Sequence, residues 1–215
     1  MNISDNILKE QLKNVYFLSG GGYGGKTTMA KLIEKKYGFV RYREGDHSDA
    51  YTAIARPEFQ PALSADRSRD WHDYFSQPPA QYSKRLRDGL REEAEFAIID
   101  LIKLSQNQKV VADVGISPDI LRRISDDSRV VLLFAPEEMT RKHYFDRTDK
   151  QQVFQFILSF PDGNELLQNV IEALHYDAEE VRKSYYDSGF YCIERREDDT
   201  IERTLEKIER HFHLV

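Results

Sequence analysis

The fold is decided by eight residues, Gly20-Gly21-Gly22-Tyr23-Gly24-Gly25-Lys26-Thr27. They match the phosphate-binding loop pattern, in which a glycine and any four residues precede Gly-Lys and a serine or threonine. Glycines let the backbone turn tightly and bring its N–H groups against phosphate oxygens, which a Cβ would obstruct. We therefore predict that residues 20–27, together with Thr28, bind the phosphates of a nucleoside triphosphate.

The last two residues of the motif have separate expected roles. Lys26 places a compact positive charge on the β- and γ-phosphates, and the Thr27 hydroxyl is the expected ligand of Mg²⁺. A helix that starts here adds the partial positive charge of its N-terminus. The predicted cofactors are ATP and Mg²⁺.

The segments on both sides of the motif support this interpretation. Residues 15–18, Val-Tyr-Phe-Leu, form a short apolar run that is typical of a buried strand. Apolar residues then recur at helical spacing from Met29 to Ile33, and Gly38 ends the segment. Strand, glycine loop and helix follow one another in the order that the motif requires.

Size and composition indicate one sizeable α/β domain spanning residues 1–215. The chain is 40% hydrophobic and 32% charged, with a formal net charge of −6, which disfavours a nucleic-acid partner. One cysteine, Cys192, excludes an internal disulfide and fits a reducing cytoplasm. No apolar run approaches the ~18 residues of a membrane span, so we expect no membrane association.

Four more apolar runs predict strands at residues 39–42, 110–115, 129–135 and 190–194. Helical patterns lie between them, including a long one at 80–105 and others at 151–159, 165–188 and 200–212. Strands that alternate with helices predict a parallel sheet covered by helices on both faces. Ligands of such sheets bind beyond the carboxyl ends of the strands.

Two acids follow predicted strands directly. Asp113 ends the run at 110–113 and is the predicted second magnesium residue, acting through water; its alternative is a turn-forming acid. Asp46 follows the second strand, two residues after Glu44. A carboxylate there could accept the proton of an acceptor hydroxyl as that hydroxyl attacks the γ-phosphoryl group, the alternative being a solvated turn.

Arginines after the fourth strand form the next candidate group. Arg141 and Arg147 lie in a charged segment, where guanidinium groups on a closing lid would stabilise the charge that develops during phosphoryl transfer. The alternative is a solvated helix. Between the second and third strands, a group of residues could face an acceptor, although its aromatic members more often belong to the core: Arg67, Arg69, Trp71, His72 and Tyr74.

With these features, the chain resembles the small-molecule kinase branch of the P-loop NTPases, which includes shikimate, gluconate and nucleoside-monophosphate kinases. The resemblance lies in the glycine loop, the Glu-Gly-Asp at 44–46, the Asp113 strand and the arginines that follow strand four. It implies a three-layer fold with strand order 2-3-1-4-5, an acceptor-binding insertion at 46–107 and a lid at 137–150. The chain lacks the motifs that adenylate and shikimate kinases carry after strand three, so it inherits neither substrate.

The predicted function is Mg²⁺-dependent transfer of the γ-phosphoryl group of ATP to an unidentified small-molecule acceptor. Lys26, Asp46, Arg141 and Arg147 are the predicted catalytic residues. The alternative is a regulatory or switch-type NTPase that hydrolyses ATP or GTP and acts through a protein partner. A switch GTPase would carry an Asn-Lys-x-Asp element, and the run after Leu133 has none. The acceptor, the choice of ATP over GTP and the oligomeric state stay open.

Overall fold

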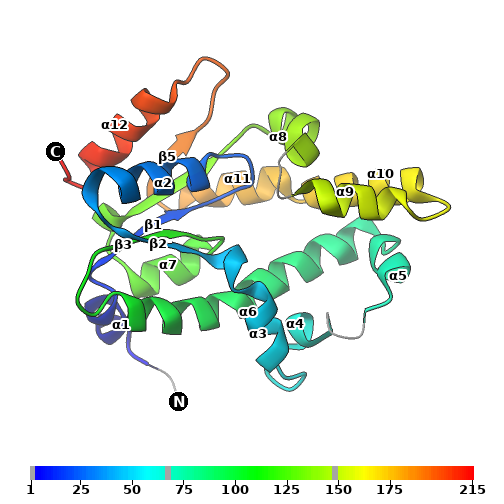
Figure 1. The fold of residues 1–215 in the computed structure, drawn as a ribbon, viewed down its shortest axis with the longest axis horizontal. Coiled ribbons are helices and arrows are strands. Elements are labelled where there is room, and N and C mark those ends of the chain that lie inside the picture. Colours follow the sequence, from blue (N-terminus) through cyan, green and yellow to red (C-terminus); the bar gives the residue numbers. More distant parts are fainter. Residues whose placement is uncertain (1–2, 66–68, 147–149) are drawn as a thin grey trace.

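The computed structural model describes residues 3–65, 69–146 and 150–215, and every structural statement below concerns those residues. Five strands form one sheet (Figure 1): β1 Val15–Ser19, β2 Val40–Arg43, β3 Val110–Asp113, β4 Val130–Phe134 and β5 Tyr191–Glu194. They lie in the order β2-β3-β1-β4-β5, and every neighbouring pair is parallel. This is the predicted fold class and the predicted strand order.

Helices occupy the connections between and around these strands. Their bounds are α1 Asp5–Gln11, α2 Lys26–Tyr37, α3 Ser48–Ile54, α4 Pro61–Ala65, α5 Trp71–Phe75, α6 Pro79–Leu104, α7 Pro118–Ile124, α8 Glu137–His143, α9 Gln151–Leu158, α10 Gly163–His175, α11 Ala178–Asp187 and α12 Ile201–His211. Short 3₁₀ turns lie at Glu44–Asp46, Asp127–Arg129 and Tyr144–Asp146. The long helix predicted at 80–105 is confirmed as α6. None of the described helices is both long enough and apolar enough to cross a bilayer.

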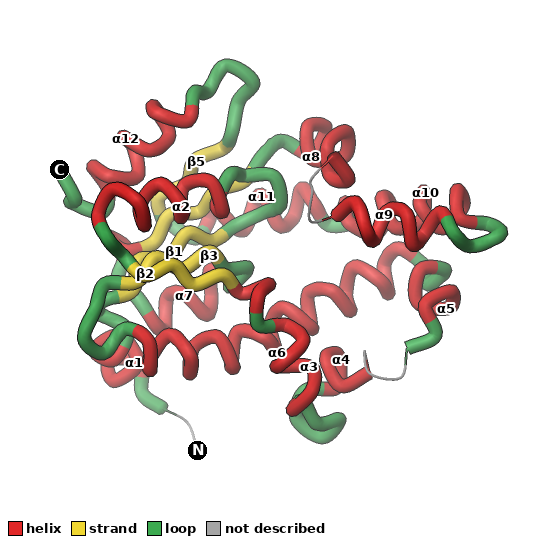
Figure 2. Tube along the Cα trace, viewed as in Figure 1, coloured by secondary structure: helices red, strands yellow, loops and turns green. Residues whose placement is uncertain are grey.

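Alternate residues of the central strands enter two different hydrophobic cores, because side chains of a strand point to opposite faces. In β1, Phe17 packs with α1, α6 and α7 on one face, whereas Leu18 packs with α2 and α12 on the other. In β4, Leu132 packs in the same core as Phe17, and Leu133 packs in the same core as Leu18. Figure 2 shows the strands between these two helical layers. The three-layer arrangement therefore follows from strands that are apolar on both faces.

A third hydrophobic cluster lies away from the sheet, where α5, α6, α9 and α10 meet. It contains Tyr74, Phe75 and Tyr82 from α5 and α6, and Ile157 and Val170 from α9 and α10. Figure 1 shows these helices extending to one side of the sheet. The molecule thus has a helical lobe beside the carboxyl ends of the strands.

The helical pattern predicted at 165–188 is two helices, α10 and α11, which Tyr176 and Asp177 separate. The side chain of Asp177 explains the break. Its Oδ2 accepts a hydrogen bond from the Ser83 hydroxyl (3.0 Å) and pairs with Arg87, both on α6. These polar contacts with α6 fix the chain at Asp177, and the hydrophobic periodicity of the sequence does not reveal them.

Candidate active site

The glycine loop connects β1 to α2, as the motif requires, and its glycines divide into two groups. A Cβ on Gly20 or Gly24 would overlap the backbone carbonyl of Leu133 at the end of β4, so these two glycines let the loop lie against the sheet. A Cβ on Gly22 or Gly25 would meet nothing within 4 Å. The second group faces open space, as a backbone cradle for a ligand does.

Lys26 is the first residue of α2, and its side chain folds back over the loop. Its Nζ donates hydrogen bonds to the carbonyl oxygens of Gly21 (2.7 Å) and Gly20 (3.2 Å). The helix behind it is capped by Gly25 in the left-handed conformation, at φ 93°. A helix N-terminus and an ammonium group therefore lie at one point, which is an arrangement suited to phosphate.

Thr27 and Asp113 come together from α2 and the end of β3. The Thr27 hydroxyl donates a hydrogen bond to Oδ2 of Asp113 (2.6 Å), and Asp113 is 6% exposed. Mg²⁺ takes oxygen ligands and usually keeps several waters, with one or two carboxylates and phosphate oxygens. The hydroxyl and carboxylate fit that chemistry. Among the described residues, no group of three or more His, Cys, Asp or Glu side chains is placed to hold a metal ion.

Glu44 is a buried carboxylate at the same end of the sheet, directly after β2. It is 6% exposed, and its Oε2 accepts a hydrogen bond from the backbone N–H of Gly115 (2.7 Å), in the loop after β3. Its Oε1 has no hydrogen-bond partner among the described residues. Burial raises the pKa of Glu44 to about 7, and the charges of Glu93 and Asp113 act in the same direction. A carboxyl group poised near neutrality is suited to accepting a proton.

The structure does not bring Asp46 into this site, where its predicted role as base would place it. Asp46 pairs with Arg43 (3.0 Å), and its side chain is 51% exposed. The 3₁₀ turn at Glu44–Asp46 separates the two acids, so that Glu44 points inward and Asp46 outward. The interpretation of Asp46 as a solvated turn residue therefore fits the geometry better than a role as base.

The predicted lid segment begins with α8, and its contacts differ from those expected. Arg141 pairs with Glu137 on the same helix (3.3 Å) and is not among the residues that line the cleft. Arg147 lies outside the described residues, as does Arg67. Helix α8 instead contacts the glycine loop through His143, whose ring stacks on Tyr23 at 5.5 Å between centroids. Arg141 keeps its catalytic assignment as a prediction that the geometry does not support.

A different arginine lies against the loop. Arg195 follows β5 directly, stacks over the Tyr23 ring (4.6 Å) and donates a hydrogen bond to the Tyr23 carbonyl (3.3 Å). Tyr23 has a positive φ of 59°, and its ring contacts both Arg195 and His143 on α8. Three segments distant in sequence thus meet at the tip of the glycine loop.

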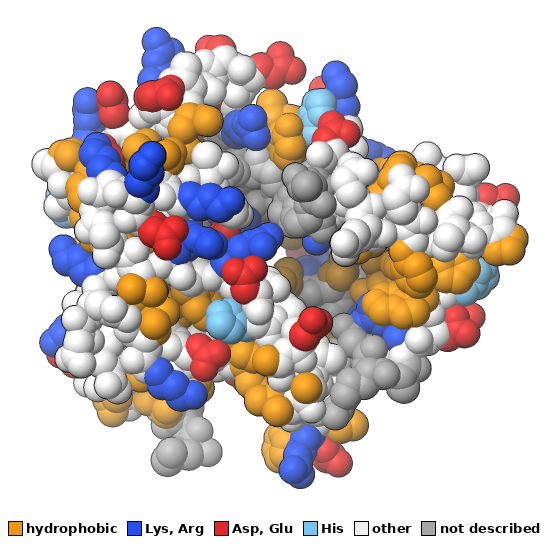
Figure 3. All heavy atoms as spheres, in the orientation of Figure 1, with side chains coloured by type: hydrophobic (Ala, Val, Ile, Leu, Met, Phe, Trp, Pro, Cys, Tyr) orange, Lys and Arg blue, Asp and Glu red, His pale blue; other side chains and the backbone are white. Residues whose placement is uncertain are grey.

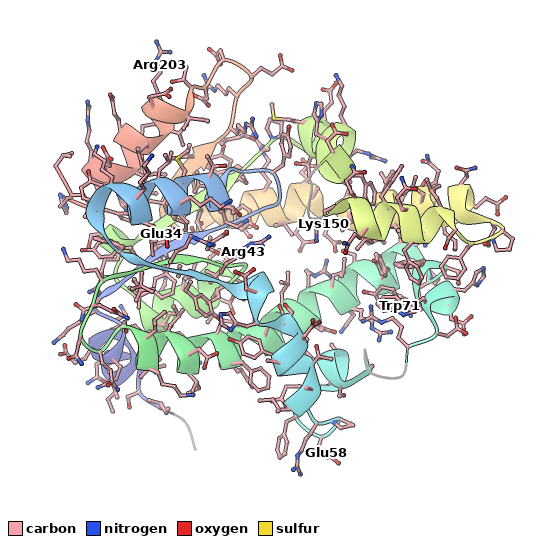
Figure 4. The ribbon with its side chains drawn as sticks, viewed as in Figure 1. Glu34, Arg43, Glu58, Trp71, Lys150 and Arg203 are labelled. Carbon is pink, nitrogen blue, oxygen red and sulfur yellow. The ribbon has the colours of Figure 1, made fainter. Side chains whose placement is uncertain are left out.

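The glycine loop, Glu44, Asp113 and Arg195 line one large cleft of about 1560 Å³. It extends from the glycine loop past Glu44 and Asp113 into the helical lobe, and a hollow is visible in the middle of Figure 3, with Lys and Arg side chains beside it. Figure 4 shows Arg43, Lys150 and Trp71 around this space. Among the described residues, its lining has eight Lys or Arg and six Asp or Glu, whereas the chain has 31 and 37. The cleft therefore favours anionic ligands more than the chain as a whole.

The far part of the cleft is lined by α5, α6 and α10. Its polar groups include Arg69, the Arg87–Asp177 pair and His175. His175 is 8% exposed, and its Nε2 has no hydrogen-bond partner in the described part of the chain. Burial lowers the pKa of His175, and the charge of Arg141 lowers it further, so the ring is neutral at pH 7.

No protein-family model and no curated protein matches this chain. Among solved structures, it is similar to shikimate kinase from Bacteroides thetaiotaomicron, with 16% identity, coverage of 93% of this chain and 98% of that chain, and a TM-score of 0.49. It is also similar to deoxyadenosine kinase from M. mycoides with bound dCTP, with 12% identity, coverage of 94% and 99%, and a TM-score of 0.42. Both of these proteins are kinases.

Sequence reasoning missed Glu44 and Arg195 as site residues, although a usable signal existed for both. Each follows a strand directly, the same criterion that selected Asp113. Glu44 shares its turn with a second acid, Asp46, and Arg195 lies in a charged run typical of a surface loop. For His175 the sequence holds no signal, since only its burial distinguishes it from an ordinary helix-end histidine.

Proposed function

We propose that this protein is an ATP-dependent phosphotransferase that moves the γ-phosphoryl group to a small-molecule acceptor with the help of Mg²⁺. The observation that carries the proposal is the position of Glu44, a buried carboxylate between the phosphate loop and the second part of a continuous cleft. A protein that only hydrolyses nucleotide needs no such second compartment. A kinase needs one, because its acceptor must reach the γ-phosphate while water is kept away.

Different residues of the chain bind the phosphates, hold the metal ion and accept the proton in this proposal. Lys26 and the glycine-loop N–H groups hold the phosphates, and Thr27 with Asp113 would hold Mg²⁺, which neutralises charge on the phosphate oxygens when bound. Glu44 takes the role of base that the sequence suggested for Asp46. Its free Oε1 is available to an acceptor hydroxyl, while the Gly115 N–H fixes the other oxygen. Lys26 is near enough for its charge to favour the ionised form of Glu44.

ADP release from ATP, measured with and without acceptors, tests the proposal. The panel contains sugars, polyols, nucleosides, hydroxy acids and their phosphorylated forms, and Lys26→Met is the inactive control. We expect at least one acceptor to raise turnover well above the rate in water. Hydrolysis that no acceptor changes would contradict the proposal and favour a regulatory NTPase.

A further inference from the structure

His175 is the last residue of α10, and it lines the cleft although it is 8% exposed. Its Nε2 has no hydrogen-bond partner within residues 3–65, 69–146 and 150–215. A buried polar atom without a partner destabilises a fold, because water satisfies the same atom in the unfolded chain. A ligand in the cleft that bonds Nε2 would remove this cost.

His211 shows the usual arrangement of a histidine at the end of a helix. It is the last residue of α12, and its Nε2 lies 3.0 Å from the carbonyl oxygens of both Asp127 and Val130. Neither of these contacts depends on a ligand, and His211 does not line the cleft. His211 therefore serves as a matched control for His175.

Contacts with two other helices locate His175 within the cleft. The end of α10 packs against α6 and α8. Asp177, two residues after His175, accepts a hydrogen bond from Ser83 of α6 (3.0 Å). On the side of α8, the charges of Arg141 and Glu137 act on the His175 ring in opposite directions. His175 thus lies where three helices meet.

Helix α6 also gives the distance from His175 to the proposed base. A Cβ on Gly115 would lie 3.2 Å from both the Glu44 carboxylate and the Leu90 side chain, so Leu90 marks the level of Glu44. Ser83 marks the level of His175 through its bond to the chain at 177. Seven residues of α-helix separate Ser83 from Leu90. The two polar groups therefore lie about 10 Å apart along the cleft.

The cleft lining between these two levels is rich in apolar side chains. Leu86 and Leu90 contribute to it from α6, and Val170 and Leu174 contribute from α10. Water gains little from such walls, whereas the hydrocarbon part of a ligand is stabilised by contact with them. The lining suits a molecule whose polar groups lie at its two ends.

The His175 ring is neutral at pH 7, because burial lowers its pKa and the charge of Arg141 lowers it further. One nitrogen of a neutral imidazole donates a hydrogen bond, and the other accepts one. A hydroxyl group both donates and accepts, so it can bond Nε2 in either tautomer. The nearby charged residues, Arg87 and Asp177, pair with each other. A hydroxyl group therefore fits this position better than a charged group.

We infer that His175 is a specificity-determining residue of the acceptor site and that its Nε2 hydrogen-bonds a second hydroxyl group of the acceptor. The inference rests on the proposed phosphotransferase function for the hydroxyl that reacts at Glu44, whereas binding at His175 requires no turnover. The acceptor then has two hydroxyl groups about 10 Å apart, joined by an apolar or ring-shaped part. A molecule with a single hydroxyl group leaves one end of the site unpaired.

Thermal unfolding of two leucine variants first tests whether Nε2 lacks a partner in the free protein. His211→Leu should lower Tm by about 3 °C, because two carbonyl groups lose their donor. His175→Leu should leave Tm unchanged or raise it, because no hydrogen bond is lost and an unpaired polar atom is removed. A loss of Tm in His175→Leu as large as in His211→Leu would overturn the inference.

A matched pair of alcohols then tests the binding itself. The full-length protein is titrated by calorimetry, without nucleotide, with 1,8-octanediol and with 1-octanol, which has the same chain and one hydroxyl group fewer. His175→Leu should weaken the diol by about tenfold relative to 1-octanol, because 1-octanol can keep its single hydroxyl group at Glu44. His175→Gln should retain part of the preference, since its amide also donates and accepts. His211→Leu should leave the ratio of the two affinities unchanged.

Nitrogen-15 NMR of the imidazole rings locates the contact. The His175 signals are identified by their absence in His175→Gln, and we expect the diol to shift the Nε2 signal. Lys26→Met should retain this response, which separates the site from the glycine loop. The inference is overturned if the diol leaves the Nε2 signal unchanged, or if the affinity ratio is the same in the wild type and in His175→Leu. If both responses are seen but no acceptor accelerates ATP turnover, the proposed function fails and the hydroxyl site at His175 stands.

Discussion

The two parts of the cleft, which we propose hold the nucleotide phosphates and the acceptor, are built in different ways. The phosphate part consists of loops at the carboxyl ends of β1, β3 and β4, and backbone groups supply many of its contacts. The acceptor part consists of side chains from α5, α6 and α10, held by the third hydrophobic cluster and by polar pairs such as Arg87–Asp177. Backbone contacts require particular residues at fixed spacing. Side-chain contacts here depend on the packing of helices that are far apart in the sequence. The first part therefore carries a motif and the second does not.

The two parts of the cleft also differ in how deeply their supporting elements are buried. The strands that hold the phosphate part are almost entirely buried, as Phe17, Val111 and Leu132 illustrate with 0% exposure. On the acceptor side, Trp71 is 42% exposed, and α5 is joined to the turn before α10 by an exposed His72–Asp162 pair (2.9 Å). Exposed pairs of this kind contribute little, about 0–1 kcal/mol. We expect substitutions in the phosphate part to have the larger effects.

The largest expected effect follows from Lys26→Met. Losing the ammonium group removes the charge that stabilises the transferring phosphoryl group, which we expect to lower kcat by about 1000-fold. Stability should change by only about 1 kcal/mol, because the lost hydrogen bonds to Gly20 and Gly21 are partly exposed. Steady-state kinetics and thermal unfolding measure the two quantities. Retained activity would remove the loop from the mechanism.

A pair of glycine substitutions compares the two faces of the loop. Gly24→Ala forces a Cβ against the Leu133 carbonyl and should destabilise the fold by about 3 kcal/mol. Gly22→Ala places its methyl group in open space and should cost under about 1 kcal/mol. Denaturant unfolding of both variants is the measurement. Equal destabilisation would show that the loop does not pack on β4 as described.

The two acids of the turn after β2 provide the next pair. Glu44→Gln should lower kcat by about 100-fold, since the buried base is lost. Asp46→Asn should stay within about threefold of the wild type, because its partner is Arg43 at the surface. Rates measured with the acceptor found in the panel compare them. A larger loss in Asp46→Asn than in Glu44→Gln would return the role of base to Asp46.

The raised pKa of Glu44 predicts that kcat depends on pH. Its pKa is raised to about 7, and only the ionised carboxylate accepts a proton, so kcat should rise with pH. A single group of that pKa is about 10% ionised at pH 6 and 90% at pH 8, which predicts a rise of about tenfold. The same profile in Glu44→Gln should be flat over this range. An unchanged rise in that variant would assign the titration to another group.

The smallest effect concerns the N-terminus of α5. The Asp70 side chain accepts hydrogen bonds from the backbone N–H groups of His72 (2.9 Å) and Asp73 (3.2 Å). Asp70→Ala should destabilise α5 by about 1 kcal/mol, whereas Asp73→Ala on the same helix should have less effect. Hydrogen exchange of the α5 amides detects the difference. Equal protection in the two variants would contradict the cap.

The sequence predicts the phosphate part well because local chemistry determines it. The glycine loop, the Thr27–Asp113 pair and the parallel sheet all follow from runs and motifs that can be recognised in the chain. The choice between Glu44 and Asp46 does not, because it depends on the Gly115 N–H, which comes from a loop about 70 residues away, and on the pairing of Arg43 with Asp46. A sequence pattern identifies two acids in one turn, but the tertiary contacts decide which one is buried.

The acceptor part was least predictable for the same reason. Arg69, Trp71 and Tyr74 are close in sequence, yet their relation to the cleft depends on α6 and α10 packing against α5. His175 is distinguished only by burial, and the break before α11 arises from the contacts of Asp177 with α6. Each of these features is a long-range side-chain contact, and none of them has a periodic signature in the chain.

The fate of the γ-phosphoryl group tests the central claim most directly. Phosphorus-31 NMR of ATP turnover, with Mg²⁺ and a mixed pool of small-molecule acceptors, distinguishes a new organic phosphate from inorganic phosphate. We predict that the wild type produces an acceptor phosphate as fast as ADP appears, and that Lys26→Met produces none. Inorganic phosphate as the sole product, formed at the same rate with and without the pool, would contradict a phosphotransferase.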